Sequence, residues 1–108
     1  MKNSCFEIIL SEQFGPISSR DSGAELRKEI EFLVASAKTQ TIIVDFQGRS
    51  VTPSFADECF GILAERWGLE TFKKRVTSRN VNPKSRVLLG HVIRNRVNSE
   101  NHQHSTAA

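Results

Sequence analysis

Small hydroxyl and carboxylate side chains are grouped in the segment from Val51 to Phe60, which reads VTPSFADECF. Thr52, Pro53 and Ser54 stand where an apolar stretch ends and a helical apolar pattern begins, which predicts a helix start. A hydroxyl there can cap the helix, hold an anion or carry a phosphate, because the first amide groups of a helix lack a partner within it. Capping alone is worth about 1 kcal/mol, so all three roles stay open at Thr52 and Ser54.

The rest of the chain offers little of the chemistry that catalysis requires. It has no glycine-rich phosphate loop, no His-Glu-x-x-His motif and no Cys-x-x-Cys pair. His91 falls within an expected helix, and His102 and His104 fall in a polar C-terminal stretch. We therefore predict a protein that is not an enzyme and that uses neither a metal ion nor a cofactor.

Charge is distributed unevenly along the chain. Residues 1–65 contain 6 Lys and Arg against 10 Asp and Glu, and residues 66–108 contain 9 against 2, giving net charges of −4 and +7. This asymmetry predicts two faces of opposite sign, suited to an acidic partner, a nucleic acid or self-association into a homo-oligomer. A solvated basic face is the simpler interpretation, since Phe72 alone gives too little aromatic surface for base stacking. The candidate nucleic-acid contacts are Lys73, Lys74, Arg75, Arg79 and Arg94.

Apolar segments separated by turn signals predict the strands that position these residues. Strands are expected over residues 5–10, 41–46 and 72–78, with a short edge strand over 17–20. The continuous run Ile42-Ile43-Val44 is typical of a strand that is covered on both faces.

Three helical segments are expected around these strands. The first is capped by Asp21 or Ser22, the second covers residues 54–67 and ends at Gly68, and the third runs from Asn82-Pro83 to Val97. This order predicts an α/β domain over residues 1–97, with a small mixed, partly parallel sheet of about three to four strands flanked by about three helices. The polar residues 98–108 are expected to form a disordered C-terminal tail.

The cellular setting is also predicted from the sequence. No apolar run approaches the roughly 20 residues of a membrane-spanning helix, and the N-terminus does not read as a signal peptide. Cys5 and Cys59 fall in apolar surroundings and are expected to be buried and reduced. We therefore predict a cytoplasmic protein without membrane contact.

Several of these residues resemble a known family. Val44-Asp45-Phe46, the segment 51–58, Phe60-Gly61 and Leu63 are similar to the STAS-like domain family of unknown function found in prokaryotes and their phages. Gly15, Arg20, Phe72 and Asn80 fit the same pattern, and the resemblance covers roughly residues 5–97.

The resemblance implies a function of the kind known from anti-sigma-factor antagonists, which share the STAS fold. Those proteins switch partners when a histidine-kinase-like ATPase phosphorylates a serine at the helix start after the central strand. The matching hydroxyl is Ser54, with Thr52 as second choice. Pro53 stands where the antagonists carry an aspartate, and Phe55 can also align with their phosphoacceptor.

The leading hypothesis is therefore a regulatory module that binds a protein partner, with such an ATPase as the implied partner. The predicted contact residues are Ser54, Asp57, Glu58 and Gly61, the glycine allowing close approach. The alternative is binding of a nucleic acid or an acidic protein by the basic C-terminal half, as in a small adaptor or inhibitor of mobile-element origin.

Overall fold

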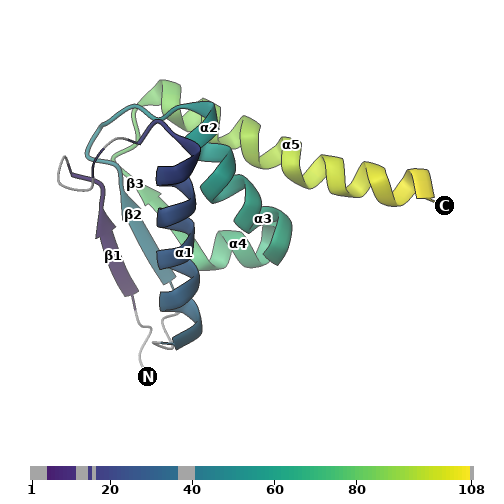
Figure 1. Ribbon diagram of the computed structural model, residues 1–108, viewed down its shortest axis with the longest axis horizontal. Coiled ribbons are helices and arrows are strands. Elements are labelled where there is room, and N and C mark those ends of the chain that lie inside the picture. Colours follow the sequence, from purple (N-terminus) through teal and green to yellow (C-terminus); the bar gives the residue numbers. More distant parts are fainter. Residues whose placement is uncertain (1–4, 12–14, 16, 37–40, 108) are drawn as a thin grey trace.

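The central strand of the sheet is β2 (Thr41–Asp45), in which β-branched side chains favour extended backbone. Strands β1 (Cys5–Ile9) and β3 (Val76–Arg79) pair in parallel with it, so the three-stranded sheet has the order β1-β2-β3. The computed structural model describes residues 5–11, 15, 17–36 and 41–107 and is shown in Figure 1. It confirms the predicted α/β class with a small sheet, and the pairings among the described strands are parallel rather than mixed.

Helices connect the strands and follow them. α1 (Arg20–Ser36) leads from β1 to β2, and α5 (Pro83–Ala107) follows β3. The connection from β2 to β3 contains α2 (Pro53–Ala56), the π-helical turn η2 (Asp57–Gly61), α3 (Ile62–Trp67) and α4 (Leu69–Arg75). The backbone stays helical through both junctions of α2, η2 and α3, so we call residues 53–67 the central helical segment. It packs against α1 on one side and α5 on the other (Figure 1).

The hydrophobic core lies between the sheet and these helices. Ile42 and Val44 are completely buried there, whereas Ile43, between them, is only half-buried. Ile43 faces the opposite side of the sheet, where Arg79 donates a hydrogen bond of 2.7 Å to the carboxylate of Glu7. The expectation that β2 is covered on both faces is therefore wrong for the described part of the chain.

The expected third strand over residues 72–78 is also wrong in its first half. Helix α4 continues to Arg75, and β3 begins only at Val76. The helix is favoured because Phe72 buries its ring in the core and three basic residues occupy its last turn, where cations complement the helix dipole. The short edge strand expected over 17–20 is likewise absent from its described residues, because Arg20 begins α1.

Three smaller expectations change as well. Ser19, rather than Asp21 or Ser22, caps α1, since its hydroxyl accepts the amide of Ser22 at 3.1 Å. Helix α5 extends through residues 98–107, which contain no proline or glycine, and the disorder expected there stays a prediction. Cys5 is exposed while Cys59 is buried as expected, and burial raises the pKa of the Cys59 thiol well above its ordinary value. The domain boundary at residue 97 stays a prediction.

A helix that crosses a bilayer must be both long and apolar. None of the helices in the described part of the chain combines these two properties.

Candidate functional site

Thr52 is the cap of the central helical segment, as predicted. Its backbone is extended (φ −101°, ψ 161°), and its hydroxyl accepts the amide of Phe55 at 3.3 Å. The same hydroxyl donates to the main-chain oxygen of Ser18 at 2.7 Å, which ties the cap to the start of α1. Thr52 thus has a structural role that uses its hydroxyl twice.

Ser54 lies in a surface hollow of about 340 Å³ next to this cap. Its side chain is half-buried, and within the described residues its hydroxyl has no hydrogen-bond partner. The walls come from three helical elements: Arg20 from α1; Pro53, Ser54 and Asp57 from the central helical segment; and Leu88, His91, Val92 and Asn95 from α5. Ser54 is therefore the more available of the two predicted hydroxyls.

Asp57, which lines the same hollow, is held by arginines of this same chain. Arg96 forms a bidentate pair with it, donating one hydrogen bond from Nε to Oδ1 at 2.8 Å and another from Nη2 to Oδ2 at 2.9 Å. Arg20 adds a contact of 3.2 Å to Oδ2. These hydrogen bonds, chiefly the one from Arg96, lower the pKa of Asp57 below its ordinary value.

Glu58, the next residue, is bonded by two arginines of α1. Arg27, which is 11% exposed, donates to its carboxylate at 3.0 Å and to its main-chain oxygen at 2.5 Å, and Arg20 reaches the second carboxylate oxygen at 3.2 Å. The hydrogen bond from Arg27 is the main cause of a lowered pKa at Glu58. Arg96 also binds Glu65 at 2.8 Å. We call this set the clasp; its members are Arg20, Arg27, Arg96, Asp57, Glu58 and Glu65.

Gly61 is buried against α5 rather than exposed to a partner. A Cβ atom there would lie 2.8 Å from Asp57 Oδ1 and 3.0 Å from Arg96 Cγ. Gly23 has the same role toward α1, since its Cβ would lie 2.7 Å from the main-chain oxygen of Phe55. The close approach expected at Gly61 is therefore used within the chain, where it lets α5 reach the clasp.

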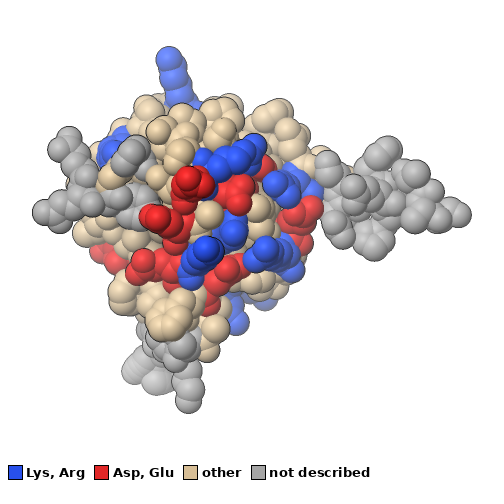
Figure 2. All heavy atoms as spheres, in the orientation of Figure 1, with Lys and Arg blue, Asp and Glu red and all other residues tan. Residues whose placement is uncertain are grey.

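The predicted basic residues do not gather at one place. Lys73, Lys74 and Arg75 occupy the last turn of α4, while Arg79 ends β3 and binds Glu7. Arg94 is exposed on α5. The two expected faces of opposite sign are also not formed, because Arg66, Arg79 and Arg96 pair with acidic residues of the first half. Figure 2 shows acidic and basic side chains interleaved on the face of the molecule that is turned toward the viewer in Figure 1.

A second hollow, of about 490 Å³, lies at the carboxyl ends of β2 and β3. Asp45, which is buried, accepts hydrogen bonds from two residues that line this hollow, from the amide of Gln47 at 2.9 Å and from Asn80 Nδ2 at 3.0 Å. These bonds lower the pKa of Asp45, the one from Gln47 most. Gln47 and Asn80 both have a φ of 56°, so Asp45 holds two loops in conformations that few residues favour.

The sequence did not predict that the three arginines of the clasp bind the carboxylates beside the cap. Arg27 is next to Leu26 on the buried side of α1, which was a usable signal, since a buried arginine requires an acidic partner. Arg96 gave no comparable signal, because its partners lie 31 and 39 residues earlier in the chain. Within the described residues, no group of three His, Cys, Asp or Glu side chains is arranged to hold a metal ion.

The parallel sheet, its helical connections and the capped helix after the central strand define an α/β domain of the STAS-like class. A sequence model of the family described as "STAS-like domain of unknown function (DUF4325)" matches residues 22–86, so the chain belongs to that family. No curated protein and no solved structure matches it. The matched region includes Ser54, while the residues of α5 that wall the hollow follow it in the sequence.

Proposed function

We propose that this protein is a non-enzymatic regulatory module that docks a protein partner at the hollow beside Ser54. The observation that carries the proposal is a half-buried hydroxyl, without a hydrogen bond to described residues, in a hollow walled by three helical elements. Apolar side chains of Pro53, Leu88 and Val92 give a docking segment something to bury against.

The switch in this proposal is phosphorylation of Ser54 by a histidine-kinase-like ATPase, the partner that the STAS resemblance implies, in the cytoplasm of a prokaryotic cell. Ser54 is preferred over Thr52, because the hydroxyl of Thr52 is already bonded to Ser18 and Phe55. A phosphate brings about two negative charges, and here it would stand in the same hollow as Asp57 and Arg20. A partner seated on the bare hollow would then be displaced.

Asp57, Glu58 and Gly61 have a different place in this proposal from the one expected. The clasp already engages both carboxylates, and α5 covers the glycine. Glu58 and Gly61 therefore support the hollow from behind, while Asp57 lines it as a carboxylate that is bonded within the chain. Nucleic-acid binding through Lys73, Lys74 and Arg79 has less support, since the two lysines lie on α4 whereas Arg79 lies on β3 and is paired with Glu7.

The test compares partner capture by immobilised wild type, Ser54→Ala, Ser54→Asp and Thr71→Asp in lysate of the native cell, with quantitative mass spectrometry. Thr71 is the matched control, because it is exposed in the first turn of α4 and receives the same carboxylate at a similar helical position. We expect a partner that binds wild type, Ser54→Ala and Thr71→Asp alike and binds Ser54→Asp at least about tenfold more weakly, a difference of about 1.4 kcal/mol.

Titration of the purified partner then separates the switch from the docking site. Equal affinity for wild type and Ser54→Asp would show that a negative charge at Ser54 does not control docking. Equal loss in Ser54→Asp and Thr71→Asp would attribute the effect to net charge instead of position. The same mass spectra report whether Ser54 or Thr52 carries phosphate in the cell.

A further inference from the structure

The α5 side of the hollow carries positive charge that the described residues leave unpaired. Lys84, Arg86 and Arg94 are exposed on α5, and none of them forms an ion pair within the described part of the chain. From Pro83 to Asn98 the helix contains no acidic residue. The surplus is therefore local to the outer surface of α5, in contrast to Arg96 on its inner side.

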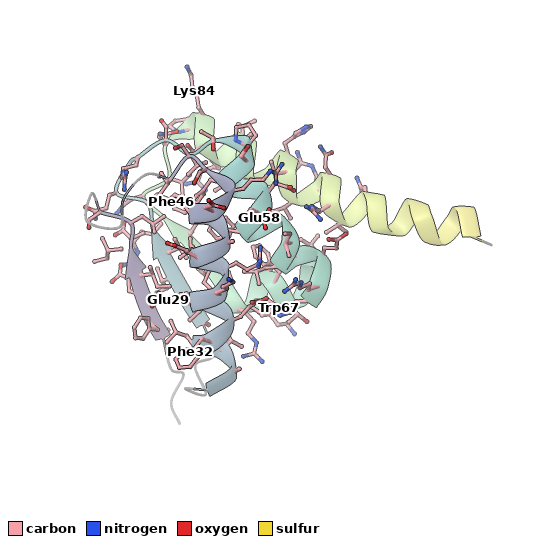
Figure 3. All side chains as sticks on the ribbon, viewed as in Figure 1. Glu29, Phe32, Phe46, Glu58, Trp67 and Lys84 are labelled. Atoms are coloured by element: carbon pink, nitrogen blue, oxygen red, sulfur yellow. The ribbon has the colours of Figure 1, made fainter. Side chains whose placement is uncertain are left out.

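Lys84 belongs to the same row of side chains as the hollow. Lys84, Leu88, His91 and Asn95 follow at helical spacing, which places them along one stripe of α5. In Figure 3 the side chain of Lys84 extends away from the body of the protein, at the start of α5, which lies close to α2 in Figure 1. Lys84 does not line the hollow itself, but it is exposed and lies one helical turn before Leu88, which does.

Apolar surface lies directly beside these cations. Leu88 and Val92 line the hollow, and Val87 on the adjoining stripe is 71% exposed. The clasp adds no net charge, because three arginines face three carboxylates. Two of its members, Arg20 and Asp57, line the hollow and offset one another, so the surplus charge near the hollow comes from α5.

We propose that the segment of the partner that occupies this hollow is an acidic amphipathic peptide. Its apolar side chains would contact Leu88, Val92 and Pro53, and its carboxylates would lie near Lys84 and Arg94. This inference rests on the proposed function, since it concerns the same site, and it names the chemical class of the partner. It also explains why phosphate on Ser54 would release that partner: like charges would meet in one hollow.

A nucleic acid fits these observations less well, although it is also a polyanion. Pro53, Leu88 and Val92 give the hollow an apolar part, and no Phe, Tyr or Trp occurs between Pro83 and Asn98 to stack with a base. Phosphate backbones are bound by rows of several cations, whereas Lys84 and Arg94 are separated along α5 by the apolar residues of the hollow.

The experiment uses the full chain labelled with nitrogen-15 and three probes: a peptide of about 15 residues built of Leu, Ala and Glu; the same peptide with Lys for Glu; and single-stranded DNA of similar length. We expect the Glu peptide to shift the amide signals of Ser54, Leu88, His91 and Asn95, and the Lys peptide to leave them in place. Charge reversal in Lys84→Glu/Arg94→Glu should weaken the Glu peptide at least about tenfold.

The matched control is Lys73→Glu/Lys74→Glu, which makes the same charge change at two exposed positions on α4. It should alter affinity for the Glu peptide by no more than about twofold. Equal weakening by both double variants, binding of the Lys peptide at the same amides, or tighter binding of DNA there would each overturn the acidic-peptide assignment.

Failure of this inference is distinguishable from failure of the proposed function. If the captured partner loses affinity for Ser54→Asp but not for Lys84→Glu/Arg94→Glu, the docking site stands and its acidic occupant is refuted. If the Glu peptide binds the hollow as expected while Ser54→Asp leaves the captured partner unaffected, the chemistry of the hollow stands and the switch is refuted.

Discussion

The clasp and the outer surface of α5 use the same kind of residue in opposite ways. In the clasp, Arg96 is about one-third exposed and is bonded to Asp57 and Glu65. On the outer surface of α5, Arg94 is exposed and has no ion-pair partner among the described residues. Both arginines belong to one helix and to the basic half of the sequence. The position of a charge relative to the packed core, rather than its place in the sequence, decides whether it holds the fold or remains available for binding.

The largest effect expected from this comparison comes from removing Arg27, the most buried charge of the clasp. In Arg27→Met the aliphatic stem is kept, but the main-chain oxygen of Glu58 loses its arginine donor and the carboxylate keeps only the contact from Arg20. We expect the free energy of unfolding to fall by about 3 kcal/mol, because two hydrogen bonds from a largely buried guanidinium group are lost. Urea denaturation measures this loss. Lys28→Met, at the exposed neighbouring position, should change stability by less than about 0.5 kcal/mol.

The next effect compares the two arginines of α5 directly. Arg96→Ala removes two hydrogen bonds to Asp57 and one to Glu65, and we expect a loss of about 2 kcal/mol, since each bond to a charged group is worth more than a neutral one. Arg94→Ala should cost less than about 0.5 kcal/mol. Equal thermal unfolding of the two variants would show that the clasp does not stabilise the packing of α5.

Local signals explain what could be predicted from the sequence. The cap at Thr52, the helix end at Gly68, where φ is 86°, and the cap of α5 at Asn82, whose Oδ1 accepts the amide of Ser85 at 2.8 Å, all depend on residues within one turn. The buried central strand was equally evident from its apolar run. These elements and the class of fold follow from short-range chemistry.

The candidate site could be predicted only in part, because it is assembled from distant segments. Ser54 was identified at the correct helix start, but its hollow exists only because α5 returns beside it. Asp57 and Glu58 were interpreted as contacts for another protein, since their arginines on α1 and α5 lie 31 to 39 residues away. Helix α4 was mistaken for strand because a short helix with one buried ring, Phe72, shows little periodicity.

The smallest effect is the response of the clasp to acid. Asp57 and Glu58 have pKa values lowered in the folded protein by their arginines. A group with a lowered folded-state pKa contributes stability that is fully present above its unfolded-state pKa of about 4 and is lost as pH falls through the folded-state value. Stability should therefore decline below about pH 5, and Asp57→Asn should reduce that decline by about 1 kcal/mol.

Carbon-13 NMR titration tests the cause: in Arg96→Ala the pKa of Asp57 should rise, whereas in Arg94→Ala it should match wild type. An unchanged titration in Arg96→Ala would remove Arg96 as the source of the shift and, with it, the distinction between the inner and outer arginines of α5.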